Sequence, residues 1–271
     1  DKCYHPQKSC RVYQADGTRR FLKDSKTCND KSKKAQERAT QLMSSTYSSN
    51  AMKLENLTPF NPLTENQAKA AADWDHSKNH LVLNGSAGTG KTYMGIRFAV
   101  EEILDKETPY EQLVIVRSIV PTRDIGFLPG MEEKLDPYKR PYQQLFTEIF
   151  KNKEAWHKME LAGRVVFEPT SFLRGTSYHN SIILVDEMQN LNFHELDTVA
   201  TRVGNNCRII LCGDYYQSDF DNDKEKNGIT DFMRIVSDMS KFEVTEFTWK
   251  DIVRSDFVRE YIMTKEMLGI K

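Results

Sequence analysis

Residues 81–92 have the sequence Leu81-Val-Leu-Asn-Gly-Ser-Ala-Gly-Thr-Gly-Lys-Thr92. An apolar run is followed at once by a glycine-rich segment that fits the pattern Gly-x₄-Gly-Lys-[Ser/Thr] without a mismatch. The next residues, 91–104, carry apolar side chains at helical spacing. A buried strand, a glycine-rich loop and an amphipathic helix in this order predict a phosphate-binding loop.

The glycines of this segment suit phosphate for a steric reason. Backbone N–H groups approach phosphate oxygens most closely where no Cβ intrudes, and the helix that begins near Lys91 adds its positive dipole end. Lys91 is expected to reach the β- and γ-phosphates, and Thr92 to offer its hydroxyl to Mg²⁺. The residues expected to bind a nucleoside triphosphate are Gly85, Ser86, Ala87, Gly88, Thr89, Gly90, Lys91 and Thr92.

On both sides of the loop, from residue 63 onward, short apolar runs alternate with helical patterns. Strands are expected at residues 81–84, 113–116, 165–167, 181–185, 209–212 and 243–247. Helices are expected at residues 91–104, 142–150, 193–203, 229–239 and 257–268. Strands that are apolar on both faces and alternate with helices indicate an α/β fold, with a parallel twisted sheet flanked by helices.

The composition divides the chain into two parts. Of its 271 residues 39% are apolar, which is enough for one sizeable core, expected as a single domain over residues 61–271. Residues 1–60 are rich in Lys, Ser and Asn and are expected to form a basic, poorly ordered appendage with a short helix at 31–43. Residues 1–40 contain 11 Lys and Arg against 5 Asp and Glu, in a chain of net charge −1. This basic segment fits either contact with phosphates or a solvated leader.

The cysteines and the lengths of the apolar runs indicate the cellular compartment that the chain suits. Five cysteines in a chain of this length do not indicate a disulfide framework, and Cys207 and Cys212 flank an apolar run as buried strand residues do. The three cysteines near His5 lack the paired Cys-x₂-Cys spacing of structural zinc sites, so zinc is not expected. No apolar run approaches the roughly 18 residues that span a membrane, and no signal-peptide stretch is visible. A cytoplasmic location without a membrane partner is therefore expected.

Two carboxylates end the apolar strand that reads Ser181-Ile-Ile-Leu-Val-Asp-Glu187. Asp186, at the carboxyl edge of the sheet, is expected to hold Mg²⁺ opposite Thr92. Glu187, one position further, can polarise an attacking water as a general base. The alternative is ordinary helix N-cap chemistry before the helix at 193–203. Together with a complete phosphate loop, the pair favours the catalytic interpretation.

Further candidate residues follow the later strands. Gly213-Asp-Tyr-Tyr-Gln217 comes after the apolar run 209–212, which puts Gln217 near the same sheet edge, within reach of the γ-phosphate or the attacking water. Arg254 and Arg259 come after the last strand, where a cation stabilises charge on the equatorial phosphate oxygens. Arg254 is favoured for this role, and Arg259 is more typical of a surface arginine.

With these residues in view, the chain resembles the PhoH family, phosphate-starvation-inducible ATPases that are also common in phage genomes. The family-specific part is Gly126-Phe-Leu-Pro-Gly130. Other matching stretches are residues 63–67, 85–92, 135–138, 172–175, 185–190, 213–217 and 251–254. These are shared with superfamily 1 helicases, so the resemblance implies a RecA-like P-loop NTPase core that binds ATP.

The resemblance also implies roles for single residues. Gln67 would contact the adenine, Gln217 would match a motif III glutamine, and Arg254 would lie near the γ-phosphate. Arg117 would adjoin a loop that contacts nucleic acid in helicase relatives, although Val116-Arg-Ser118 replaces the Thr-Arg-Pro of the family pattern. Met188 stands where many relatives carry alanine, and we expect it to pack.

Two functions remain open from the sequence. The first is an ATPase that uses Mg²⁺ and drives movement on RNA or another nucleic acid. A translocating helicase needs two such lobes and only one fits in about 200 residues, so a homo-oligomer is expected. The second is a regulatory protein that binds ATP with little turnover, against which Glu187 and Gln217 argue. A fused ribonuclease module is not expected, because it needs roughly 100 further residues.

The sequence does not decide whether nucleic acid binds. Tyr138, Tyr142 and Phe146 are candidates for base stacking, but aromatic residues at helical spacing are more often part of a core. The basic segment 1–40 favours phosphate contacts, and the negative balance of the remaining residues opposes them.

Overall fold

The computed structural model describes residues 11–13, 19–21, 51–119, 131–173, 177–214 and 223–269. The chain divides into two compact units, Asp1–Ala51 and Met52–Lys271. In the first unit, β1 (Arg11–Tyr13) pairs antiparallel with β2 (Arg19–Phe21). The helix expected at 31–43 lies outside the described residues.

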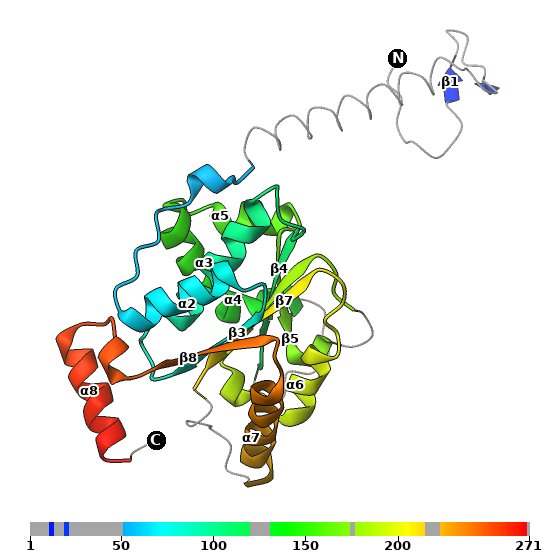
Figure 1. The fold of residues 1–271 in the computed structure, drawn as a ribbon. Coiled ribbons are helices and arrows are strands. Elements are labelled where there is room, and N and C mark those ends of the chain that lie inside the picture. The colour runs from blue at the N-terminus through cyan, green and yellow to red at the C-terminus, as the bar shows by residue number, and fades with distance from the viewer. Residues whose placement is uncertain are drawn as a thin grey trace. The chain divides into compact units, whose positions relative to one another are not determined.

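The second unit is built on a six-stranded parallel sheet (Figure 1). Its strands are β3 (His80–Gly85), β4 (Gln112–Arg117), β5 (Val165–Pro169), β6 (Ser181–Asp186), β7 (Cys207–Gly213) and β8 (Phe242–Phe247). Their order across the sheet is β5-β4-β6-β7-β3-β8. All six expected strands are confirmed, and β7 lies between β3 and β6.

The helices surround this sheet. They are α2 (Glu65–His76), α3 (Lys91–Leu104), α4 (Met131–Phe150), α5 (Ala155–Leu161), α6 (Phe193–Ala200), α7 (Asp223–Asp238) and α8 (Asp256–Met267). Short 3₁₀ turns are η1 (Leu54–Asn56), η2 (Thr170–Phe172), η3 (Met188–Asn190) and η4 (Trp249–Asp251). The five expected helices are confirmed, although α4 begins earlier and continues through Pro137 and Pro141. The sequence prediction lacks α2 and α5; α2 buries only Gln67, Ala70 and Trp74, so its apolar pattern is weak.

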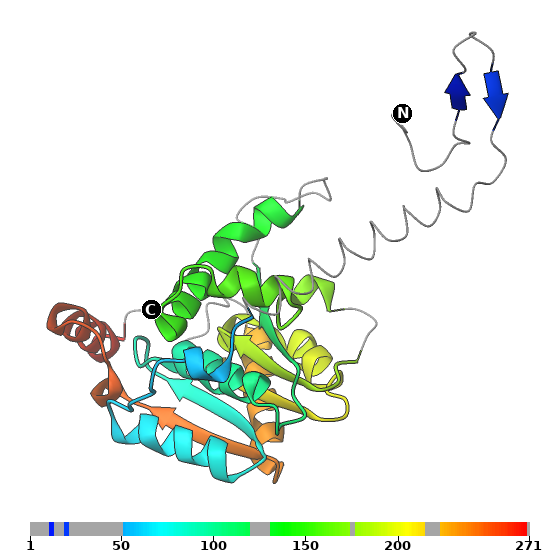
Figure 2. The same ribbon diagram turned by 90° about the horizontal axis from the view of Figure 1, so that it is seen from above.

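Alternate strand residues bury against two layers of helices. Leu81 and Leu83 of β3 belong to a core shared with α2, α3, α4 and α5, and Val82 between them belongs to a core shared with α6 and α7. Figure 1 shows α6 and α7 on the opposite side of the sheet from α2, α3 and α5. Figure 2 shows α8, which has no buried residues, at the edge of the unit. The expected α/β fold, a parallel sheet flanked by helices, is confirmed.

The segment that precedes α2 packs on the second unit. The Phe60 ring lies 6.5 Å from that of Tyr93 and 5.6 Å from that of Phe98. The Thr58 N–H donates to the Ile149 carbonyl at 2.9 Å. The second unit begins at Met52, and Phe60 buries its ring against the core of that unit. The expected division into a basic appendage over 1–60 and a single domain over 61–271 stays a prediction.

Two other sequence expectations concern cysteines and membranes. Cys207 and Cys212 lie in β7 as expected, the first half-buried and the second buried, and both are free thiols. The cysteines near His5 lie outside the described residues. Among the described helices, none combines the length and apolar character that crossing a bilayer requires.

Candidate active site

Three strands bring the candidate residues to one edge of the sheet. Because the strands are parallel, β3, β6 and β7 all end on this edge, at Gly85, Asp186 and Gly213. A cavity of about 840 Å³ opens there, within the size range of ligand sites. Its lining residues include the loop from Ala87 to Thr92 together with Gln67, Arg117, Tyr142, Asp186, Glu187, Gln189, Asp214 and Arg254.

The loop between β3 and α3 has the backbone of a phosphate cradle. Gly85, Gly88 and Gly90 have φ values of 123°, 77° and 87°, in a region that side-chain-bearing residues rarely adopt. A Cβ at Gly85 would lie 1.9 Å from the carbonyl oxygen of Phe247 in β8. Gly90 is the N-cap of α3, so the unpaired N–H groups of the helix start face the loop. The strand, loop and helix unit of a P-loop NTPase is present.

Gly85→Ala is expected to lower the free energy of unfolding by about 3 kcal/mol or more, because backbone strain and an unrelievable backbone clash add together. For a unit of this size, the melting temperature would fall on the order of 10 °C. Thermal unfolding followed by circular dichroism measures this effect. Gly163→Ala is the control, since Gly163 also has a positive φ (67°) but nothing within 4 Å of its added Cβ. Equal melting temperatures for the two variants would contradict the role of the Phe247 contact.

Segments distant in sequence hold the loop in place. The Gln67 amide, 4% exposed, donates through Nε2 to the Thr89 carbonyl at 3.0 Å and accepts through Oε1 from the Leu63 N–H at 2.8 Å. The Gly88 carbonyl accepts from the Val253 N–H at 3.1 Å. Gln67 therefore supports the loop, a role that the sequence did not indicate, and its contact with adenine stays a prediction.

Lys91 points back onto the loop. Its ammonium donates to the carbonyls of Gly85 and Ser86 at 2.5 and 2.7 Å. Burial lowers the pKa of Lys91, and nearby acidic groups, including Asp214 and Glu187, offset only part of this effect. The ammonium is thus poorly solvated and satisfied by neutral carbonyls, which suits replacement of these partners by anionic phosphate oxygens.

Asp186 joins α3, α4 and β6 through its carboxylate. The Thr92 hydroxyl donates to its Oδ1 at 2.7 Å, and the Tyr142 hydroxyl donates to its Oδ2 at 2.8 Å. Burial, together with the Asp186 charge, raises the pKa of Tyr142 well above its usual value, so the phenol stays protonated. A hydroxyl and a carboxylate oxygen side by side match the oxygen ligands that Mg²⁺ prefers. The Tyr142 contact was missed, because only the fold brings α4 to this strand end.

Glu187 lines the same cavity in an unusual backbone conformation. Its φ of 51° is in the left-handed region, which costs a non-glycine residue about 1 kcal/mol. Its Oε2 accepts from the Gln189 side chain at 2.6 Å, and Oε1 of Gln189 accepts from the Asp214 N–H at 3.1 Å. Gln189 thereby ties Glu187 to the end of β7. The sequence prediction assigned Gln189 no role, although it lies within the matching stretch 185–190.

Of the remaining candidates, the structure describes the three arginines but not Gln217 or residues 126–130. Arg254 is exposed and lines the cavity, with its Cγ 3.0 Å from where a Cβ on Gly88 would lie. Arg117 also lines the cavity, and its charge offsets part of the rise in the pKa of Tyr142. Arg259 is not among the described lining residues. Gln217 and the stretch 126–130 lie outside the described residues, so their roles stay predictions.

The aromatic residues of α4 belong to the core. Tyr142 and Phe146 are both 0% exposed, so the stacking of nucleic-acid bases considered for them is wrong. Their rings pack instead against Trp156, at centroid distances of 6.5 and 5.1 Å. Met188 is 1% exposed, which confirms that this position packs.

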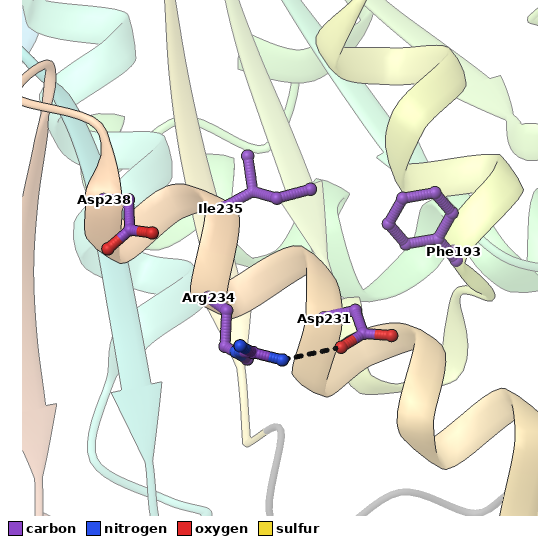
Figure 3. Close-up of a pocket in the computed structure, with 5 residues that line it drawn as sticks. All are labelled: Phe193, Asp231, Arg234, Ile235 and Asp238. Atoms are coloured by element: carbon purple, nitrogen blue, oxygen red, sulfur yellow. Dashed lines mark hydrogen bonds and ion pairs between the residues drawn. The ribbon is translucent and has the colours of Figure 1, made fainter.

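A second hollow lies between α6 and α7, away from the loop (Figure 3). It has a volume of about 320 Å³ and is lined by Phe193, Asp231, Arg234, Ile235 and Asp238. The ion pair drawn there, Arg234 with Asp231 at 3.5 Å, joins two solvent-exposed side chains. Such a pair contributes little to stability, so it does not make this hollow a preorganised polar site.

The family model described as PhoH-like protein matches residues 59–266. The chain belongs to this family. It is 31% identical over 184 residues to a PhoH-like protein of Synechocystis sp., covering 67% of this chain and 55% of that one. It is 29% identical over 182 residues to the protein PhoH of Escherichia coli, covering 66% of this chain and 51% of that one. The chain thus spans about half the length of these PhoH relatives.

Solved structures of two other proteins resemble this PhoH-family chain. The large terminase of a thermophilic bacteriophage is similar with a TM-score of 0.49 and 11% identity, over 76% of this chain and 50% of that one. The unliganded Pif1 of Bacteroides sp. is similar with a TM-score of 0.36 and 15% identity, over 78% of this chain and 48% of that one. Both likenesses concern the fold alone.

Proposed function

We propose that this PhoH-family domain binds ATP with Mg²⁺ and hydrolyses it. One observation carries the proposal: the phosphate-loop residues Lys91 and Thr92 line the same cavity as the carboxylates of Asp186 and Glu187. Binding alone requires the loop and a metal ligand. A strained glutamate one residue beyond that ligand is the additional element that water activation requires.

Each side chain of the site has a separate role in this proposal. Lys91 would exchange its loop carbonyls for β- and γ-phosphate oxygens. Thr92 and Asp186 would hold Mg²⁺, which would supply positive charge against the phosphates. Glu187 takes a proton from the attacking water. Gln189 keeps the Glu187 carboxylate oriented through its 2.6 Å hydrogen bond. Arg254, beside Gly88, supplies a cation for the equatorial oxygens, and Gln217 senses the γ-phosphate.

The cavity also contains side chains that suit the adenine base of ATP. Phe60 and Tyr93 line the cavity with their rings 6.5 Å apart, and Asn61 adds an amide beside them. Flat apolar rings next to an amide suit a purine. We propose that adenine lies here, and that Gln67, which lines the same cavity and donates to the Thr89 carbonyl, links base recognition to the loop.

We propose further that turnover takes place in a cytoplasmic homo-oligomer and is coupled to single-stranded nucleic acid. The support is the basic segment 1–40 and the argument that one lobe alone cannot translocate a strand. Arg117, at the end of β4, lies next to the segment that the resemblance links with nucleic acid.

One experiment tests these proposals together. Phosphate release from ATP is measured with and without Mg²⁺ and single-stranded RNA, at increasing salt, with light scattering on the same samples. We expect release that requires Mg²⁺, stimulation by RNA that weakens as salt rises, and a mass above that of a monomer. Absence of Mg²⁺-dependent release would overturn hydrolysis. A salt-independent rate unaffected by RNA would overturn only the coupling, and a monomer with and without ATP would overturn the oligomer.

A further inference from the structure

Tyr142 places a hydroxyl group deep inside the unit, directly on Asp186. Its ring is 0% exposed and lies 5.6 Å from the ring of Phe167 and 6.5 Å from that of Trp156. A phenylalanine would make the same ring contacts without burying a polar group, which is costly unless it is hydrogen-bonded. The packing of the core therefore does not account for the hydroxyl.

The hydroxyl completes the hydrogen bonding of the Asp186 carboxylate. Thr92 donates to Oδ1 at 2.7 Å and Tyr142 donates to Oδ2 at 2.8 Å, so each oxygen has a donor from a different helix. A carboxylate with one donor rotates about its Cβ–Cγ bond, whereas donors on both oxygens define its plane. Partners that orient a metal-binding carboxylate in this way influence metal affinity.

Arg117 places a cation near the same pair. Its charge offsets part of the rise in the pKa of Tyr142, so the cation acts on the hydroxyl that donates to Asp186. The strand register sets Arg117 directly opposite Asp186 in the neighbouring strands β4 and β6. Arg117 thus adds a positive charge near the hydrogen bond from Tyr142 to Asp186.

We propose that Tyr142 is a positioning residue of the Mg²⁺ site, which sets the orientation of the Asp186 carboxylate and so the affinity for Mg²⁺ with nucleotide. The proposal rests on the proposed function, because it concerns the metal that accompanies ATP. Tyr142 donates to Asp186, and its proposed effect on Mg²⁺ passes through that carboxylate.

The test is Tyr142→Phe, with binding of a fluorescent ATP analogue measured in EDTA and across a Mg²⁺ titration. We expect the Kd in EDTA to stay within about two-fold of wild type, and the Mg²⁺ concentration for half-maximal tightening to rise about ten-fold. Tyr138→Phe is the matched control, since Tyr138 is a half-buried tyrosine of the same helix that packs against the same core. This control is expected to titrate like wild type.

Asp186→Asn shows whether the effect passes through Asp186. Adding Tyr142→Phe to that variant is expected to change the Mg²⁺ titration by less than about two-fold, because coupled residues are not additive. An unchanged titration for Tyr142→Phe alone, or an equal loss in EDTA and in Mg²⁺, would overturn the positioning role and leave the proposed function intact. If nucleotide binding by the wild-type protein does not change with the Mg²⁺ concentration, both the positioning role and the proposed function are overturned.

Discussion

Lys91→Ala is expected to reduce kcat/KM for ATP hydrolysis by about 10²- to 10³-fold, which corresponds to about 3–4 kcal/mol of lost stabilisation. Lys91 is the cation at the centre of the loop, and its ammonium is hydrogen-bonded to neutral groups, the carbonyls of Gly85 and Ser86 and the Thr89 hydroxyl. Without it, charge that builds on the phosphate oxygens has no fixed counter-charge inside the cradle. Phosphate release at several ATP concentrations measures the loss.

The fold of this variant is expected to survive. Burial already lowers the pKa of Lys91, so the buried ammonium destabilises the folded state and alanine removes that cost. We therefore expect a melting temperature close to that of wild type, measured by thermal unfolding. Lys69→Ala is the control, since Lys69 is an exposed lysine of α2 paired with Asp73 at 2.6 Å. A Lys91→Ala protein with kcat/KM within a few-fold of wild type would exclude the loop as the phosphate site.

Glu187→Gln is expected to slow ATP hydrolysis by about 10²-fold or more while ATP affinity stays within a few-fold of wild type. The substitution keeps the shape of the side chain and its left-handed backbone, but the amide cannot accept a proton from water. Single-turnover phosphate release measures the chemical step, and equilibrium binding of ATP measures affinity separately.

Glu148→Gln is the matched control for this result. Glu148 is an exposed glutamate of α4 that lines the same cavity, so its variant removes the same charge from the site without touching the end of β6. We expect its rate to stay within a few-fold of wild type. Equal and negligible rates for wild type and Glu187→Gln would instead favour the regulatory protein that binds ATP with little turnover.

Local patterns in the sequence were sufficient for the strands, for α3 and for the phosphate loop. The apolar runs give strands that are buried on both faces, and the expected helix at 91–104 coincides with α3. These features depend on neighbouring residues, since the period of the side chains and the freedom of Gly88 and Gly90 are properties of the chain itself. The helix α2 was missed because its apolar pattern is weak. The helix α4 was predicted too short because Pro137 and Pro141 lie within it.

What the sequence alone determined is the strand, loop and helix at 80–104 and the acidic end of β6, because each is encoded by residues in direct succession. Only the tertiary structure decided which groups meet there. The strand order put β7 between β3 and β6, α4 brought Tyr142 to Asp186 across 44 residues, and Gln67 reached Thr89 across 22. Such contacts depend on the packing of helices against a sheet. The spacing of apolar residues along the chain does not indicate which buried side chain will donate a hydrogen bond to a distant carboxylate.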